Sequence, residues 1–262
     1  MSKDQKKYLR KIKIRKYIIL FSQVIIIIAF FGIWEYLANK NIINTFVFSK
    51  PSKIFDTILN LITQNNLFNH IFTTLKEVLI SFSLGILLGL IIAIILYEFP
   101  LLADIVDPFL TMINSLPKVA LGPLIIIISG ANIKSVIVMA LLINLIISII
   151  TIYNGFINID EKRIKMIKSF KANKFQILTK LIIPSSYKTI ISSLKLNISM
   201  SLIGVIMGEF LVSKAGIGYL IIYGTQVFNL SLVMAGILIL VVISYILYKI
   251  ITFIESRLIK KF

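Results

Sequence analysis

Six long apolar runs limit what this chain can fold into more than any other feature of its sequence. Each run has roughly 20 residues or more, the length that a helix needs to cross about 30 Å of hydrocarbon. The runs cover residues 17–38, 71–97, 108–129, 135–156, 189–212 and 230–254. A mean hydropathy of +0.97, with 58% hydrophobic residues, is far above the range of soluble domains. The sequence therefore predicts an all-α polytopic membrane protein with six transmembrane helices.

The basic residues between these runs predict the orientation of the spans. Eight lie within the first sixteen residues, eight more lie from Lys162 to Lys188, and three lie after residue 256. The loops on the opposite side together hold five. Loops rich in Lys and Arg stay in the cytoplasm, so both termini and the long basic loop are expected there. The predicted organisation is a basic N-terminal segment (1–16), a transmembrane domain (17–256) that includes a cytoplasmic loop (160–184), and a cytoplasmic tail (257–262).

The composition also excludes several kinds of protein. The net charge of +17 lies almost wholly outside the apolar runs, which fits a membrane-facing rim, so no nucleic-acid partner is predicted. There is no cysteine and His70 is the single histidine, so no metal site is predicted. No GxxxxGK[ST] phosphate loop occurs, so neither catalytic residues nor a bound cofactor are expected in this chain. The first run is too long for a signal peptide and lacks a cleavage site, so it is expected to remain as a span.

Several shorter features indicate local structure. The segment 51–69 has apolar residues at helical spacing and begins with proline, which predicts an amphipathic helix on the outer surface. Gly85 and Gly89 form a GxxxG pattern, which is typical of closely packed helices. Gly216 and Gly218 would let the segment before the sixth run adopt positive φ.

The basic loop between runs four and five has the pattern of two short helices. Its apolar residues share one helical face and its lysines the other; the apolar set is Ile164, Met166, Ile167 and Phe170. Lys171 falls on the apolar face, so the first helix should end or turn there. A second helix should run from Lys174 to Pro184, because Ile183 precedes a proline and is biased away from helical geometry. Such a segment either docks on a partner protein or lies on anionic lipid.

Polar residues and helix breakers interrupt the third run, namely Asn114, Ser115, Pro117, Lys118, Gly122 and Pro123. Backbone groups freed by such residues cannot be satisfied in lipid, so this stretch should face other helices or a water-filled path. Lys118 either faces that path or extends to the inner surface. Lys195 is expected to extend to the surface in the same way. Glu209 either pairs within the bundle or caps the fifth run at the outer interface.

The spacing of the basic loop is similar to the EAA loop of ABC importer permeases. That motif is E-A-A, three residues, G, nine residues, then I-x-L-P. Here the triplet falls on Lys165, Met166 and Ile167, the glycine position on Lys171, and the last position on Pro184, so the spacing matches while most identities differ. Further segments resemble the sulfonate, taurine, nitrate and thiamine-precursor branch of that family, at 50–54, 74–89, 107–124 and 208–220.

The resemblance implies a type I ABC importer permease fold and a set of partners. The chain would pair with a second permease, expected to be a copy of itself, within the membrane lipid of a bacterial plasma membrane. Two ABC ATPase subunits, which hold ATP and Mg²⁺, would dock on the loop, and an extracellular substrate-binding protein would deliver the cargo. The residues expected to couple to the ATPase are Lys165, Ile167, Phe170, Lys171, Ala172, Asn173, Phe175 and Pro184. The expected translocation-path residues are Asn114, Ser115, Lys118 and Glu209.

The cargo implied by this branch is a small anion such as a sulfonate, taurine or nitrate, with a thiamine-precursor or other heterocyclic nutrient as the alternative. Two other classes of protein stay open. An intramembrane enzyme would need a catalytic cluster, whereas the spans offer Glu77 and Glu209, far apart in sequence. A secondary transporter usually shows two related halves with broken helices, and this sequence lacks them.

Overall fold

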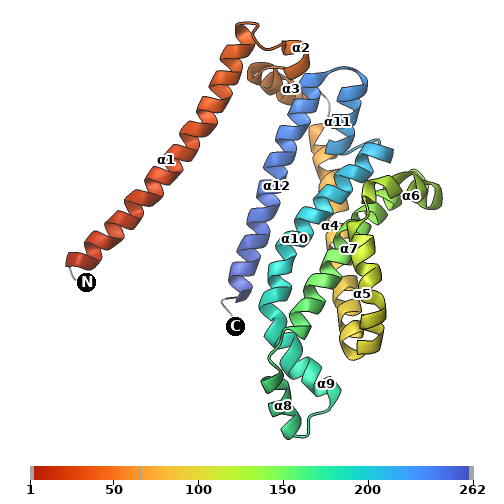
Figure 1. Ribbon diagram of the computed structural model, residues 1–262. Coiled ribbons are helices and arrows are strands. Elements are labelled where there is room, and N and C mark those ends of the chain that lie inside the picture. Colours follow the sequence, from red (N-terminus) through yellow and green to blue (C-terminus); the bar gives the residue numbers. More distant parts are fainter. Residues whose placement is uncertain (1–2, 65, 260–262) are drawn as a thin grey trace. The chain divides into compact units, whose positions relative to one another are not determined.

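The computed structural model describes residues 3–64 and 66–259, and every regular element in these ranges is helical (Figure 1). The elements are α1 (Lys3–Asn39), α2 (Thr45–Phe48), α3 (Pro51–Thr63), α4 (Leu67–Glu98), α5 (Pro100–Ser115), the 3₁₀ turn η1 (Lys118–Leu121), α6 (Gly122–Ser129), α7 (Ile133–Ile157), α8 (Glu161–Ser169), α9 (Lys174–Ile177), the π-helical turn η2 (Leu178–Ile182), α10 (Ile183–Val212), α11 (Ile217–Gln226) and α12 (Leu230–Ile259). The all-α prediction is confirmed. The end of the predicted tail, from residue 260 on, lies outside the described residues.

Five helical stretches are each long and apolar enough to cross a membrane: α1, α4, α7, the continuous stretch Lys174–Val212, and α12. The sixth predicted span takes another form. Helix α5 and the η1–α6 segment meet the same test only as a pair, and that pair is bent by 90°. The described residues therefore contain five continuous candidate spans, or six if the bent pair is one span.

The third predicted span, 108–129, is wrong in its start and its shape. Helix α5 begins at Pro100, because proline suits the first turn of a helix. The helix ends where Leu116 adopts extended backbone (φ −63°, ψ 139°), since the residue before a proline, here Pro117, is disfavoured in helical geometry. The chain thus turns between two separate helices at the position of the predicted helix breakers.

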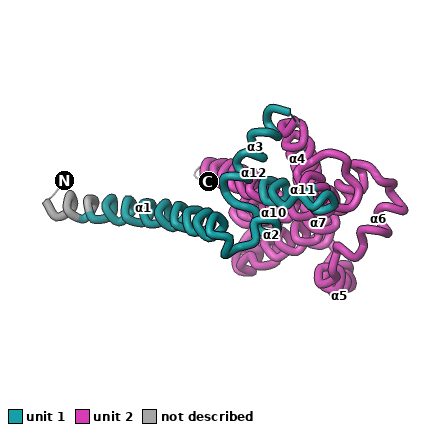
Figure 2. Tube along the Cα trace, turned by 90° about the horizontal axis from the view of Figure 1, so that it is seen from above, with its two compact units in different colours: residues 1–65, 224–235 teal, residues 66–223, 236–262 magenta. Residues whose placement is uncertain are grey.

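The chain divides into two compact units, coloured separately in Figure 2. The first unit comprises residues 1–65 and 224–235, and the second comprises 66–223 and 236–262. The candidate sites described below lie in the second unit.

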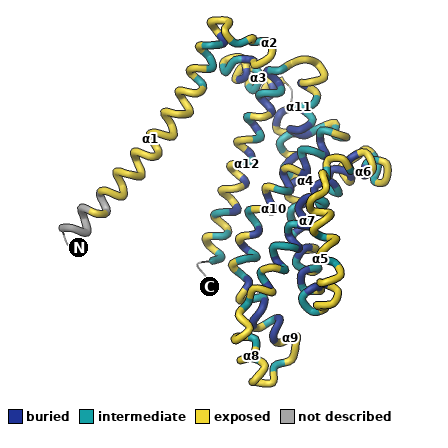
Figure 3. The backbone as a smooth tube through the Cα atoms, in the orientation of Figure 1, coloured by how far each residue is buried: buried dark blue, intermediate teal, exposed yellow. Residues whose placement is uncertain are grey.

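In the first unit, α1 runs without a break from the basic N-terminal segment into the first apolar run. All residues from 11 to 30 are exposed, as the yellow tube in Figure 3 shows. The end of α1 is tied to α3, because Glu35 accepts hydrogen bonds from the backbone nitrogen of Ser52 at 3.0 Å and from its hydroxyl at 2.9 Å. Helix α3 is amphipathic, as predicted, and buries Ile54 and Leu61, but it ends at Thr63, so the predicted helix over 51–69 is too long.

The core of the second unit is a bundle of α4, α7 and α10, which pack along one another. Small residues permit this closeness: a Cβ on Gly89 would collide with Ser148, so the predicted role of the GxxxG pattern is confirmed. Buried polar side chains bond across the bundle. Asn144 of α7 donates to the carbonyl of Ser81 at 2.9 Å and to the hydroxyl of Ser201 at 2.6 Å. These bonds fix the register of the three helices, because unpaired amides are costly away from water.

Candidate functional site

The basic loop forms a helical hairpin, made of α8 and α9, at one end of the second unit (Figure 1). Asp160 caps α8 by accepting a hydrogen bond from the backbone nitrogen of Lys162 at 2.8 Å. Asn173 caps α9 through a reciprocal pair of bonds: it accepts from the backbone of Gln176 at 2.8 Å, while the Gln176 side chain accepts from the backbone of Asn173 at 2.9 Å. Local sequence therefore determines where both helices begin.

The turn between these helices lies where the sequence predicts it. Helix α8 ends at Ser169, and Lys171 adopts a left-handed backbone with φ of 59°. A side chain with a Cβ is strained there, whereas glycine adopts that geometry readily. This conformation gives a physical reason for the glycine that the EAA motif has at the position of Lys171.

The apolar face of the hairpin is divided between the bundle and the solvent. Ile164, Ile167 and Ala172 pack against the buried cluster of Ala93, Ile152, Phe156, Ile177, Leu178, Leu181 and Ile182. In contrast, Met166, Phe170 and Phe175 are 56%, 79% and 70% exposed. We call these three the exposed apolar residues of the hairpin. Among the predicted coupling residues, Ile167 and Ala172 hold the hairpin to the bundle, and Phe170 and Phe175 face outward.

The sequence analysis did not place Met166 among the coupling residues. Met166 lies four residues before Phe170, and therefore on the same side of the helix. Lys165, which was selected, forms an exposed ion pair with Glu161 at 3.0 Å within α8. Exposed pairs of this kind contribute little to stability. Lys165 is therefore available to a partner at small cost.

Pro184 does not end the second helix of the hairpin, and this prediction is wrong. Ile183 is fully helical (φ −57°, ψ −49°), and α9, η2 and α10 form one continuous stretch. A proline inside a helix lacks an N–H and clashes with the carbonyl four residues earlier. The π-helical turn at Leu178–Ile182 widens the helix just before the proline, which lets the helix pass.

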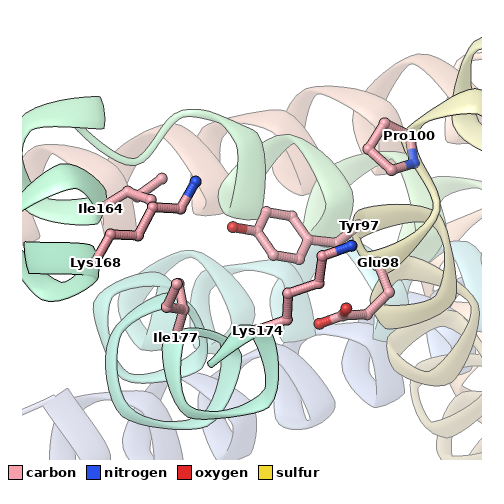
Figure 4. A pocket seen from close by; sticks show the side chains of 7 residues that line it. All are labelled: Tyr97, Glu98, Pro100, Ile164, Lys168, Lys174 and Ile177. Carbon is pink, nitrogen blue, oxygen red and sulfur yellow. The ribbon is translucent and has the colours of Figure 1, made fainter. Parts of the chain in front are cut away.

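A pocket of about 160 Å³ lies between the hairpin and the junction of α4 with α5 (Figure 4). Its lining residues are Tyr97, Glu98, Pro100, Ile164, Lys168, Lys174 and Ile177. Glu98 and Lys174 lie on one side of the pocket and Lys168 lies on the other, with Tyr97 between them. The α4–α5 junction and the hairpin therefore lie at the same end of the bundle, as the predicted topology requires.

Asn114, Ser115 and Lys118 lie at the break between α5 and α6. The Nζ atom of Lys118 donates to the carbonyl of Asn114 at 2.8 Å and lies 3.5 Å from its Oδ1 atom. A cation at this point satisfies carbonyls that α5 leaves unpaired at its C-terminus. Asn114 and Ser115 are exposed and Lys118 is half-buried. The structure thus brings three of the four predicted path residues together.

Glu209 lies apart from them, fully buried among α4, α10 and α11. It accepts hydrogen bonds from the hydroxyl of Thr74 at 2.6 Å and from the backbone nitrogen of Gly218 at 2.5 Å. The Thr74 hydroxyl also accepts from the backbone nitrogen of Ile217 at 2.8 Å. The side chain therefore pairs within the bundle and does not cap the span at an interface.

His70 adds a second attachment for the segment before α11. Its Nδ1 atom accepts a hydrogen bond from the backbone nitrogen of Gly216 at 3.1 Å, and its ring stacks on Tyr219 with centroids 5.9 Å apart. Gly216 has a φ of 114°, so the predicted need for a glycine with positive φ is confirmed there.

Lys195 is partly exposed, and it has a local partner that the sequence analysis did not predict. It forms an ion pair with Glu255 of α12, which also accepts a hydrogen bond from the hydroxyl of Ser192 at 3.3 Å. The Lys195 Nζ atom lies 5.9 Å from the centroid of the Tyr248 ring. The facing helix α12 thus supplies a carboxylate that pairs with the charge of Lys195.

Comparisons with known proteins agree with this arrangement. A family model described as the binding-protein-dependent transport system inner membrane component matches residues 85–260. A probable ABC transporter permease of Haemophilus influenzae is 29% identical over 216 residues, which cover 82% of this chain and 87% of that protein. A putative aliphatic sulfonates transport permease of Bacillus subtilis is 26% identical over 229 residues, 87% of this chain and 83% of the relative. Other relatives are named as permeases for taurine and for formylaminopyrimidine.

The fold also has a solved counterpart. A chain of an inward-facing methionine ABC transporter superposes with a TM-score of 0.65 at 16% identity and covers 75% of this chain and 99% of that one. At this identity the likeness concerns the fold alone.

Proposed function

This chain belongs to the family of binding-protein-dependent transport system inner membrane components and is an ABC importer permease, and we propose that its α8–α9 hairpin docks on a separate ATPase. In this proposal the ATPase subunits hold ATP and Mg²⁺, and an extracellular binding protein supplies the cargo. The permease itself provides the path and the coupling.

The exposed apolar residues of the hairpin are the observation that carries this proposal. Two aromatic rings and a methionine stand in solvent on a segment whose other apolar residues, Ile164 and Ile167, are already packed against the bundle. Aromatic residues and methionine are enriched at the cores of protein interfaces, where a groove on the partner covers them. A lipid surface is disfavoured as the cover, because the hairpin extends beyond the ends of α4 and α7 in the second unit (Figure 1).

The remaining parts of the proposal concern assembly and location. A second permease, expected to be a copy of this chain, would complete the path, and both termini would lie in the cytoplasm of a bacterium. ATP binding would bring two hairpins together and switch the path between inward and outward access. The 90° break between α5 and α6 would line that path with Asn114, Ser115 and Lys118.

We propose a small anion, such as a sulfonate, taurine or nitrate, as the cargo. Two relatives are named for aliphatic sulfonates and taurine, and the half-buried ammonium of Lys118 would attract a negative substrate. A relative named for formylaminopyrimidine supports a heterocyclic nutrient as the second candidate.

The docking proposal is tested by replacing Phe170 with serine. The permease is co-expressed with an ABC ATPase subunit from the same organism, and the amount of ATPase that co-purifies is measured. Phe170→Ser should reduce co-purification at least tenfold, because interface anchors of this kind contribute about 2 kcal/mol or more. Lys162→Ser, an exposed change on the same helix, is the matched control and should bind normally. Equal recovery of the ATPase with both variants would reject this docking surface.

A further inference from the structure

Two acidic side chains lie buried together where α4, α10 and α11 meet. Glu77 is 2% exposed and Glu209 is 0% exposed. Thr74, one helical turn before Glu77 on α4, donates its hydroxyl to Glu209 at 2.6 Å, so the two carboxyl groups are neighbours. Within the described part of the chain, the ion pairs are Lys165 with Glu161 and Lys195 with Glu255, so neither buried acid has a basic partner. Two negative charges in contact inside a low-dielectric bundle would repel each other strongly.

The hydrogen-bond donors around the pair distinguish its two members. Glu209 accepts from the hydroxyl of Thr74 and from the backbone nitrogens of Gly218 and Tyr219. These nitrogens belong to the first turn of α11, where backbone N–H groups have no partner within the helix and favour a negative charge. The Oε2 atom of Glu77, in contrast, has no hydrogen-bond partner. The surroundings therefore suit a carboxylate at Glu209 and a neutral acid at Glu77.

We propose that Glu77 is a neutral carboxylic acid whose O–H donates to Glu209, and that it is a positioning residue for α11. A hydrogen bond between two carboxyl groups requires one proton, and the three other donors at Glu209 leave Glu77 to supply it. The ionisable neighbours do not compete for this role: Lys76 is exposed, and the Nδ1 atom of His70 accepts from Gly216.

The pair of acids contributes to the attachment of α11 to α4 and α10. The segment before α11 reverses the chain with a φ of 114° at Gly216. Its backbone bonds to side chains of α4 and α10, namely His70, Thr74 and Glu209. Glu209 serves as the acceptor for the first turn of α11, and Glu77 fixes the orientation of that acceptor. Removing the donor at Glu77 would leave a buried carboxylate short of one hydrogen bond, which is costly.

The test uses the absence of cysteine in this chain. A spin label on Lys214→Cys, an exposed residue just before α11, reports the mobility of the segment in the purified, full-length protein. Glu77→Gln keeps a donor of the same length, so mobility should match the parent and the apparent melting temperature should change by less than about 2 °C. Glu77→Met has a similar length without a donor. It should raise the mobility and lower the melting temperature by about 4–8 °C.

The same variants identify which outcome would contradict the proposal. If Glu77→Met behaves as Glu77→Gln does, Glu77 acts by packing alone. If Glu209→Gln is tolerated while Glu77→Gln is not, the proton resides on Glu209. Infrared difference spectra between the parent and Glu77→Gln at pH 8 give an independent measurement. This measurement requires only that these two proteins fold. The parent should show the carbonyl band of a protonated carboxylic acid, which Glu77→Gln lacks, and absence of that band from the parent would reject the proposal.

Discussion

Gly204 of α10 lies directly against Ala140 of α7, so that a Cβ on Gly204 would stand 2.5 Å from the Cα atom of Ala140. Backbone cannot yield to that contact as a flexible side chain would. The two helices therefore approach each other as closely as their main chains allow, and the position accepts glycine alone.

Gly204→Ala should accordingly separate α7 from α10. Overpacking of this kind costs about 1–3 kcal/mol, so the apparent melting temperature of the purified protein should fall by several degrees. Gly32→Ala is the matched control, because nothing lies within 4 Å of its Cβ position in α1. A fall of the same size in both variants would show that the loss of glycine itself, and not the contact with Ala140, is responsible.

Lys171→Gly should stabilise the hairpin turn. The left-handed backbone at Lys171, with φ of 59°, strains a residue that has a Cβ. Glycine relieves this strain but loses more chain entropy on folding, so we expect a net gain of up to about 1 kcal/mol. Hydrogen exchange of the α8 and α9 amides would measure it. Lys168→Gly, inside α8, should instead lower protection, and a gain there would contradict the explanation.

Removing one member of the Lys195–Glu255 pair should be worse than removing both. Lys195→Met leaves the carboxylate of Glu255 between two helices without its cation, whereas Lys195→Met with Glu255→Met leaves no charge at all. Melting temperatures of the two single variants and the double variant would form a mutant cycle. Additive losses in that cycle would mean that the two charges do not interact.

Cysteines placed in this cysteine-free chain can establish its topology. Asn173→Cys, in the hairpin, and Asp56→Cys, in α3, are both exposed positions. In intact cells an impermeant thiol reagent should label Asp56→Cys at once and Asn173→Cys after permeabilisation, because the hairpin is predicted to be cytoplasmic. Labelling of Asn173→Cys in intact cells would reverse the predicted orientation.

Lys118→Gln tests the nature of the cargo. If an anion passes the break between α5 and α6, loss of this ammonium should lower uptake about tenfold or more, because a charge in a low-dielectric passage acts strongly. Uptake of sulfonate, taurine and nitrate would be followed in vesicles that contain the whole transporter. Lys134→Gln, an exposed lysine at the start of α7, is the control. Unchanged uptake with Lys118→Gln would assign Lys118 to the capping of α5.

The sequence predicts the features that depend on local patterns. The apolar runs identify the spans, and the hairpin turn at Lys171 follows from an interrupted apolar face. The same local rule correctly ends α5 before Pro117, but it fails at Pro184, where a π-helical turn absorbs the proline. Sequence alone cannot reveal why one proline ends a helix and the other does not, because the outcome depends on how the residues that follow each proline pack.

Local sequence patterns do not predict which distant residues pair with each other. Lys195 and Glu255 are sixty positions apart, and Glu77 and Glu209 are more than twice as far apart. Each of these residues, taken singly, looks like a polar exception in an apolar run. Their partners become evident only when α4, α10 and α12 are placed side by side, and no periodicity within one run specifies that placement.

The helix that passes Pro184 without a break has a structural consequence. From Lys174 to Val212 it is one continuous helical stretch of 39 residues, with a length along its axis of about 58 Å at 1.5 Å per residue. One end begins beside Asn173 in the hairpin, and Glu209 lies within one turn of the other. One continuous helix therefore joins the hairpin to the acid that holds α11, and the π-helical turn at Leu178–Ile182 is an irregular point along it.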